Sequence, residues 1–186
     1  TICDPTLYRN RFRNSLYYID KLVCEILDEL EASGELENTS IVITSDHGEE
    51  FNDYKKNYWG HGSNYAPAQV HVPFYLYHPE KEADIIHTRT SHLDVAPTLM
   101  KQPLSVSNDV RDYSVGEDLF TTNRQENWVI VGSYMDYGIV GGNEIIVNRP
   151  GGYTEITDLK LNKKSERTMP NRELTKLLQQ MSVYAK

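Results

Sequence analysis

An acidic residue and a histidine stand next to each other where an apolar run of this chain ends. The run, residues 41–45, is rich in β-branched side chains and is followed directly by Asp46, His47 and Gly48. Such a run is typical of a buried strand, and in open α/β sheets functional sites lie just beyond the carboxyl ends of the strands. Because carboxylate and imidazole groups both bind divalent metal ions, Asp46 and His47 are candidate metal ligands.

The two side chains can share one ion only if the backbone bends between them, because successive side chains of a strand point to opposite faces. Gly48 favours such a bend, since glycine has no Cβ that would forbid a positive φ. The alternative interpretation is an ordinary turn in which Asp46 caps the next segment and His47 is merely solvated.

A second histidine, His61, follows between two glycines. Gly60 and Gly62 allow a ligand or phosphate to approach the backbone closely and leave the imidazole free to point into a cleft. His61 could position or protonate a substrate oxygen, or ligate a second ion. A solvated loop histidine is the alternative, and the presence of Asp46 and His47 favours the functional interpretation.

Other acidic residues near these motifs are assigned less specific roles. Glu49, Glu50 and Asp53 are expected to be solvated, with hydrogen bonding to the metal ligands as the alternative. Asp94 is expected at the N-terminus of a helix, where its negative charge interacts favourably with the helix dipole.

The residues before the apolar run predict a helix that would support it. Apolar residues recur at steps of three and four over residues 5–32 and make one apolar face. Asp4 is expected to cap the beginning of this helix, and Gly34 to end it. A helix that leads within a few residues into a strand, here residues 40–45, is typical of α/β units with a parallel sheet.

The middle of the chain is predicted to contain a long loop between two strands. Residues 49–68 are rich in glycine, asparagine, tyrosine and acidic residues, and loops of that length are usually functional. Residues 72–77 predict a second strand, and residues 91–100 a short helix.

The character of the sequence changes after residue 123. Four short β-like runs separated by turn residues predict an antiparallel meander, and residues 171–184 predict a helix. The expected fold class is therefore α/β, with a partial, mainly parallel sheet flanked by helices over residues 1–123. A small antiparallel α+β subdomain is expected over residues 124–186.

Composition excludes some classes of function. The net charge of −8 argues against a nucleic-acid-binding surface, which requires clustered lysine and arginine. No apolar stretch of the chain approaches the ~20 residues that span a bilayer. Hydrophobic residues at 39% and charged residues at 25% indicate a folded globular protein rather than a disordered one.

Three stretches together resemble the C-terminal part of the alkaline phosphatase/sulfatase superfamily core. They are residues 38–49 with Asp46-His47-Gly48, then Gly60-His61-Gly62 with Val72-Pro73, and residues 91–99. The resemblance covers about residues 10–100. Within the superfamily the chain is most similar to the periplasmic domain of inner-membrane sulfatase-like proteins of the YejM/PbgA type.

This resemblance implies a metal-dependent hydrolase or transferase of phosphate or sulfate esters. Asp46 and His47 match the metal ligands of the family, and His61 matches the histidine that contacts the transferred group. Mixed carboxylate and imidazole ligation of one divalent metal ion favours zinc or manganese, with magnesium possible. The family's nucleophile and a further acidic ligand lie earlier in its domain, and no Cys-x-Pro-x-Arg motif occurs here. The chain is therefore expected to be a fragment that is inactive alone.

The resemblance also implies a location and partners. It indicates a periplasmic domain of an inner-membrane protein, anchored by an upstream segment, that acts on an ester substrate or a lipid head group. The alternative is a weakly catalytic or non-catalytic module that regulates lipopolysaccharide and outer-membrane homeostasis by binding lipid or protein partners. A partial sheet would also leave an exposed edge, which favours association with another chain.

Overall fold

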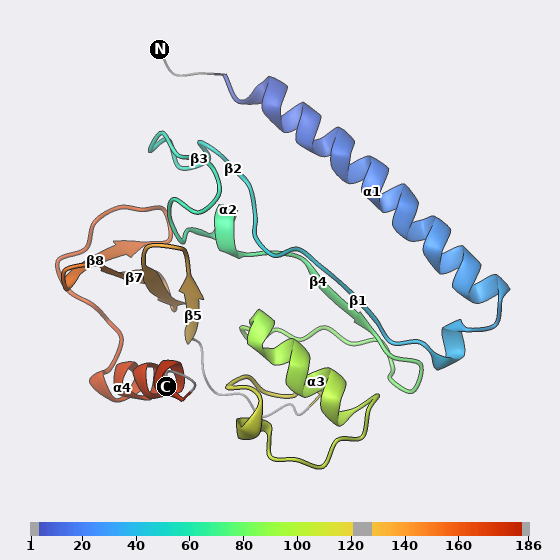
Figure 1. The fold of residues 1–186 in the computed structure, drawn as a ribbon. Helices are drawn as coiled ribbons and strands as arrows, with labels where there is room; N and C mark the ends of the chain where they lie inside the picture. The colour runs from blue at the N-terminus through green and yellow to red at the C-terminus, as the bar shows by residue number, and fades with distance from the viewer. Residues whose placement is uncertain (1–3, 121–127, 184–186) are drawn as a thin grey trace. The chain divides into compact units, whose positions relative to one another are not determined.

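The computed structural model describes residues 4–120 and 128–183, and the chain divides into two compact units, Thr1–Ala83 and Asp84–Lys186 (Figure 1). The boundary expected near residue 123 between a core and a small subdomain lies outside the described residues and stays a prediction. No helix within the described ranges is both long and apolar enough to cross a membrane.

Helix α1 (Thr6–Ala32) confirms the long helix expected in the first unit. The N-cap residue is Pro5 rather than the predicted Asp4, and Oδ1 of Asp4 accepts a hydrogen bond from the backbone N–H of Thr6 at 3.0 Å. Gly34, with φ at +77°, follows the helix and donates its N–H to the carbonyl of Glu31. A short 3₁₀ helix, η1 (Leu36–Asn38), then leads into the first strand.

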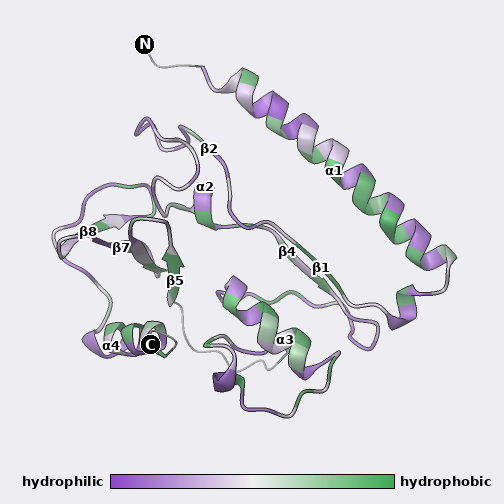
Figure 2. Ribbon diagram, viewed as in Figure 1, coloured by the Kyte–Doolittle hydropathy of each residue, from purple (hydrophilic) through white to green (hydrophobic). Residues whose placement is uncertain are grey.

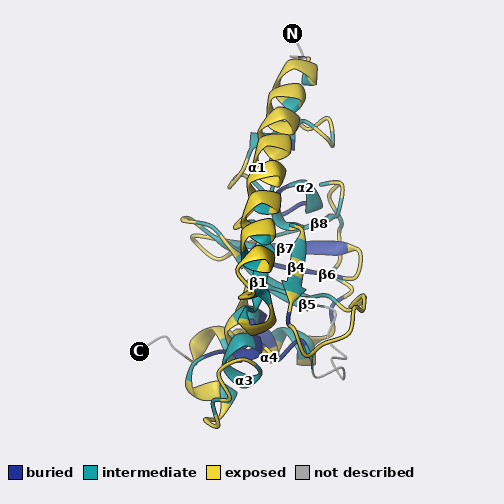
Figure 3. Cartoon of the chain, turned by 90° about the vertical axis from the view of Figure 1, so that its right-hand side faces the viewer, coloured by how far each residue is buried: buried dark blue, intermediate teal, exposed yellow. Residues whose placement is uncertain are grey.

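The apolar face of α1 stays largely exposed (Figures 2 and 3). Its N-terminal half packs against a small hairpin, formed by β2 (Glu50–Phe51) and β3 (Trp59–Gly60), through three side-chain contacts: Tyr8 with Trp59, Phe12 with Phe51, and Arg9 with Asp53. The ring centroids lie 6.1 Å apart in the first pair and 5.5 Å apart in the second. This hairpin lies within the segment predicted as a long loop.

Replacing Phe12 with alanine will loosen the hairpin from α1. Loss of the Phe12–Phe51 ring pair should weaken their association by about 1 kcal/mol, the usual contribution of an aromatic pair. Faster hydrogen exchange of the Phe51 and Trp59 amides would report it. Tyr17, which is 77% exposed on the same helix, provides the control through Tyr17→Ala. Equal exchange rates in the two variants would contradict the prediction.

Strand β1 (Ile41–Thr44) forms a two-stranded sheet with β4 (Phe74–Tyr77), and the pairing is antiparallel. The prediction of a mainly parallel sheet is therefore not met among the described strands. A helix followed by a strand does not specify which strand lies beside it, and the neighbour that this chain supplies runs back along β1. Helix α2 (Pro67–Val70) precedes β4.

The second unit begins with a helix whose start is fixed by a buried carboxylate. A 3₁₀ turn, η2 (His92–Asp94), continues into α3 (Val95–Lys101), as predicted for residues 91–100. Asp94 is fully buried, and its carboxylate accepts N–H groups of Ser91 at 2.7 Å and Glu117 at 2.9 Å. Asp94 therefore has the helix N-terminal position expected for it. Another 3₁₀ turn, η3 (Val110–Asp112), follows.

The predicted meander forms an antiparallel sheet in the order β5–β6–β7–β8. Its strands are β5 (Trp128–Gly132), β6 (Tyr137–Gly141), β7 (Glu144–Arg149) and β8 (Tyr153–Asp158). Helix α4 (Asn171–Ser182) confirms the C-terminal helix. Its Leu177 joins Ile139, Ile146 and Met169 in a buried cluster that forms the core of this unit.

Candidate functional site

The chain turns sharply where β1 ends. The Ser45 hydroxyl donates to the carbonyl of His47 at 2.7 Å, and the N–H of His47 donates to Oδ1 of Asp46 at 3.0 Å. Each bond joins groups only one or two residues apart in the chain, which is typical of a turn and not of a strand. The turn brings Oδ2 of Asp46 within 3.7 Å of Nε2 of His47.

Gly48 serves this turn in a different way from the one expected. It is absent from the residues with positive φ, so conformational freedom is not the reason for a glycine here. A Cβ at this position would lie 2.2 Å from the carbonyl oxygen of Ala68, and the Gly48 N–H donates to the Gln69 carbonyl at 2.8 Å. Glycine is required here because the backbone of Gly48 lies too close to the backbone of Ala68 and Gln69 for any side chain to fit between them.

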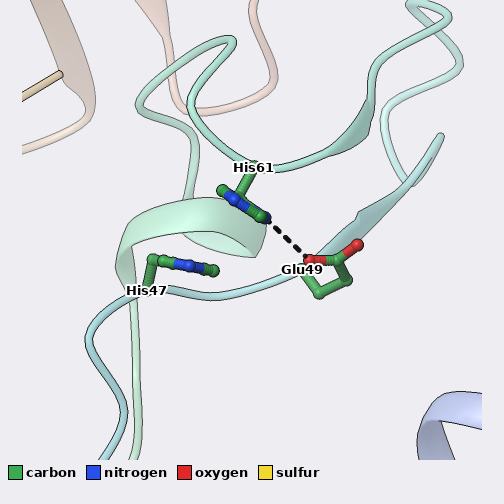
Figure 4. A group of neighbouring side chains, drawn as sticks. All are labelled: His47, Glu49 and His61. Atoms are coloured by element: carbon green, nitrogen blue, oxygen red, sulfur yellow. Dashed lines mark hydrogen bonds and ion pairs between the residues drawn. The ribbon is translucent and has the colours of Figure 1, made fainter. Parts of the chain in front are cut away.

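His61 lies on the loop that continues from β3, between glycines with φ of +80° at Gly60 and +73° at Gly62. Its ring stacks on that of His47, with centroids 3.8 Å apart and planes inclined by 22°. Nδ1 of His61 lies 3.2 Å from Oε2 of Glu49 (Figure 4). The structure thus brings together the two histidines that sequence analysis singled out.

Glu49 was expected to be solvated, but it is part of this cluster. One ligand atom each from His47, Glu49 and His61 lies within 4.8 Å of the others. The hairpin explains this position: β2 pairs Glu50 with Gly60, so the preceding Glu49 stands beside His61. Only the pairing of β2 with β3 would have indicated this position, and the sequence of this segment is typical of a loop.

Glu50 was also expected to be solvated, and this expectation is wrong. Its side chain is fully buried, and Oε2 accepts from Asn64 Nδ2 at 2.8 Å and Gln69 Nε2 at 2.7 Å. Nearby, burial raises the pKa of Tyr54, and the charges of Glu50 and Asp53 act in the same direction. Asp53 accepts hydrogen bonds from Phe51 and Arg9, so it too is engaged with protein groups.

The four side chains at the end of β1 form two carboxylate–imidazole pairs, Asp46 with His47 and Glu49 with His61. The lone pair of a ring nitrogen lies in the ring plane, so nearly parallel rings direct their lone pairs side by side rather than to one point. Among the described residues, His47, Glu49 and His61 form a group whose ligand atoms are close enough to hold a metal ion, and Asp46 lies outside that group. Asp46 is 85% exposed at its side chain and His47 42%, so a bound ion would be open to a substrate.

Zinc–ligand distances of about 2.0–2.2 Å for imidazole nitrogen and carboxylate oxygen place two ligand atoms on one ion up to about 4 Å apart. The 3.7 Å between Asp46 Oδ2 and His47 Nε2 fits this limit. The donor set also fits zinc and manganese, which accept mixed nitrogen and oxygen ligands.

Comparisons with known proteins point to one family. The family model described as Sulfatase matches residues 4–102. The chain is 28% identical over 150 residues to the inner membrane protein YejM of Salmonella typhimurium, a match that covers 80% of this chain and 25% of that protein. It is 29% identical over 111 residues to the choline-sulfatase of Rhizobium meliloti, covering 60% of this chain and 21% of that protein.

The fold is similar to the crystal structure of the phosphonate monoester hydrolase of Agrobacterium radiobacter. The TM-score is 0.63 at 18% sequence identity, over 90% of this chain and 39% of that chain. The chain spans about a quarter of the length of the curated relatives that it matches.

Proposed function

This chain belongs to the sulfatase family, and from that premise we propose that it is part of a metal-dependent hydrolase or transferase of phosphate or sulfate esters. Its fold is of the sulfatase/alkaline-phosphatase type, with mixed helices and sheets. The proposal rests on one observation, the two carboxylate–imidazole pairs that meet where β1 ends.

Asp46 and His47 would hold the metal ion, through Oδ2 and Nε2. When bound, a divalent ion lowers the pKa of a nucleophile and neutralises charge on the transferred group. We expect zinc or manganese, with magnesium also compatible with this family, and further ligands and the nucleophile from other parts of the parent protein.

His61 would contact the ester. Glu49 accepts a hydrogen bond from Nδ1 of His61, which fixes the ring and leaves Nε2 for a non-bridging or leaving oxygen of the substrate. Gly62 leaves space beside His61 for a phosphate or sulfate group to approach, because a Cβ there would meet nothing within 4 Å. In this assignment Asp46 and His47 bind the ion, His61 touches the substrate, and Glu49 orients His61.

Metal content of the parent protein tests the assignment. We expect about one divalent ion per chain after reconstitution with zinc or manganese, and affinity weakened at least about tenfold in Asp46→Ala and His47→Ala, by analogy with the loss on removing metal-supporting groups. His87→Ala, which removes an exposed histidine of the other unit, is the control. A wild-type protein that retains no ion, or an Asp46→Ala variant that binds it unchanged, would overturn the proposal.

The similarity to YejM supports a second candidate function, a membrane-anchored module of the cell envelope that works by binding lipid or protein partners. We place the domain in the periplasm under either function, and expect an ester substrate or lipid head group as its small partner. If Asp46→Ala and His61→Ala abolish ester cleavage but leave the cellular phenotype intact, the regulatory function is favoured. Joint loss of cleavage and phenotype favours the enzyme.

A further inference from the structure

The two histidines of the candidate site come from separate turns, and both turns are tied to Gln69. Gln69 lies at the end of α2 and is only 2% exposed. Its backbone carbonyl accepts the N–H of Gly48, the residue after His47, at 2.8 Å. The missing Cβ of Gly48 lets the two backbones meet at this point.

The side chain of Gln69 holds the other turn. Its Oε1 accepts the backbone N–H groups of Ser63 at 3.1 Å and Asn64 at 3.4 Å, and its Nε2 donates to the Ser63 hydroxyl at 2.9 Å. Ser63 lies two residues after His61. One amide side chain thus fixes the path of the backbone that leaves His61.

The buried carboxylate of Glu50 fixes Gln69 in turn. Oε2 of Glu50 accepts from Gln69 Nε2 at 2.7 Å and from Asn64 Nδ2 at 2.8 Å. Glu50 has no exposed surface, and its Oε1 has no hydrogen-bond partner among the residues that the structure describes. Because Oε2 accepts from both amides, Asn64 and Gln69 must each turn their NH₂ group, rather than their oxygen, toward Glu50.

We propose that Gln69 is a positioning residue that sets the distance between the His47 and His61 rings. It acts through its backbone on the turn of His47 and through its side chain on the loop of His61, and it touches neither ring in the contacts described. The importance of the distance between the His47 and His61 rings for ester chemistry rests on the proposed function. The effect of Gln69 on that distance is independent of the proposed function.

The test is the NMR cross-peak between ring protons of His47 and His61 in the full chain, which stacking at 3.8 Å should make strong. In Gln69→Leu, which removes the bonds to Glu50, Ser63 and Asn64, we expect the cross-peak to disappear. Gln102→Leu is the matched control. Gln102 donates to Asp118 at 2.9 Å, so this substitution breaks an amide-to-carboxylate bond of the same type in the other unit. This variant should keep the cross-peak.

A reciprocal exchange covers the case in which Gln69→Leu does not fold. Gln69→Glu sets a second carboxylate beside Glu50 and should lose the cross-peak, whereas Glu50→Gln combined with Gln69→Glu restores an amide-to-carboxylate bond and should regain it. A cross-peak retained in folded Gln69→Leu, or absent from the folded double variant, would overturn the proposal. Failure of the proposed function would appear instead as absent metal binding with the cross-peak intact.

Discussion

Alanine in place of Gly48 will disrupt the candidate site and destabilise the first unit by about 1–3 kcal/mol, the usual effect of overpacking a close contact. The new Cβ would lie 2.2 Å from the carbonyl oxygen of Ala68 and 3.3 Å from the carbonyl carbon of Gln69. These are backbone atoms, so relief requires movement of a whole segment. The hydrogen bond from Gly48 to Gln69 would be lost with that movement.

Two measurements on Gly48→Ala separate stability from site geometry: the unfolding midpoint in denaturant, and zinc affinity of the parent protein. Both should fall. Gly132→Ala is the control, because a Cβ on Gly132 would meet nothing within 4 Å and the residue does not have a positive φ. Equal midpoints for the two variants would show that the backbones at Gly48 are free to separate.

Glu144 is expected to contribute the largest single pH-dependent stabilisation in the second unit. It is fully buried and accepts from Lys164 Nζ at 2.8 Å and from the N–H groups of Thr168 and Met169. Burial alone would raise the pKa of Glu144, but these donors outweigh it and lower the pKa from 4.5 to about 2.

A carboxyl group whose pKa is lower in the folded state stabilises the fold above its unfolded pKa. The stabilisation is therefore complete above about pH 4.5, is lost as pH falls toward 2, and amounts to about 3 kcal/mol for a shift of this size. Glu144→Gln should lower the free energy of unfolding by about that amount at pH 7 and have little effect near pH 2.

Denaturant unfolding at several pH values, followed through the fluorescence of Trp128, checks this prediction. Asp109→Asn is an informative control, since its pKa is also lowered to about 2, chiefly by the hydrogen bond from Arg111, but the group is exposed. Exposed ion pairs contribute little, so its unfolding midpoint should not move. If Glu144→Gln lowered the free energy of unfolding by the same amount at pH 7 and pH 2, the stabilisation could not come from the charge of Glu144.

Sequence patterns predicted the helices and strands of this fold better than they predicted which strands pair with each other. The apolar face over residues 5–32 and the short β-like runs after residue 123 led directly to α1 and to the β5–β8 sheet, because each pattern is local. The direction of the strand beside β1 is set by β4, which lies about thirty residues away, and no local pattern contains that information.

The candidate site shows the same division. Asp46, His47 and His61 could be identified from residue type and neighbouring glycines, and the family resemblance on which their roles depend is confirmed. Their roles stay a prediction. Glu49 and Glu50 could not be distinguished from solvated acids, because their contacts follow from a hairpin whose strands are only two residues long.

The strand order of the second unit bears on how the protein folds. Each strand from β5 to β8 pairs with the next one along the chain, whereas β1 must find β4 across a much longer stretch. Sheets built from contacts close in sequence form faster, since only short loops have to close. We therefore expect the meander to be complete before β1 and β4 meet, so that the histidine turns are among the last parts of the chain to be ordered.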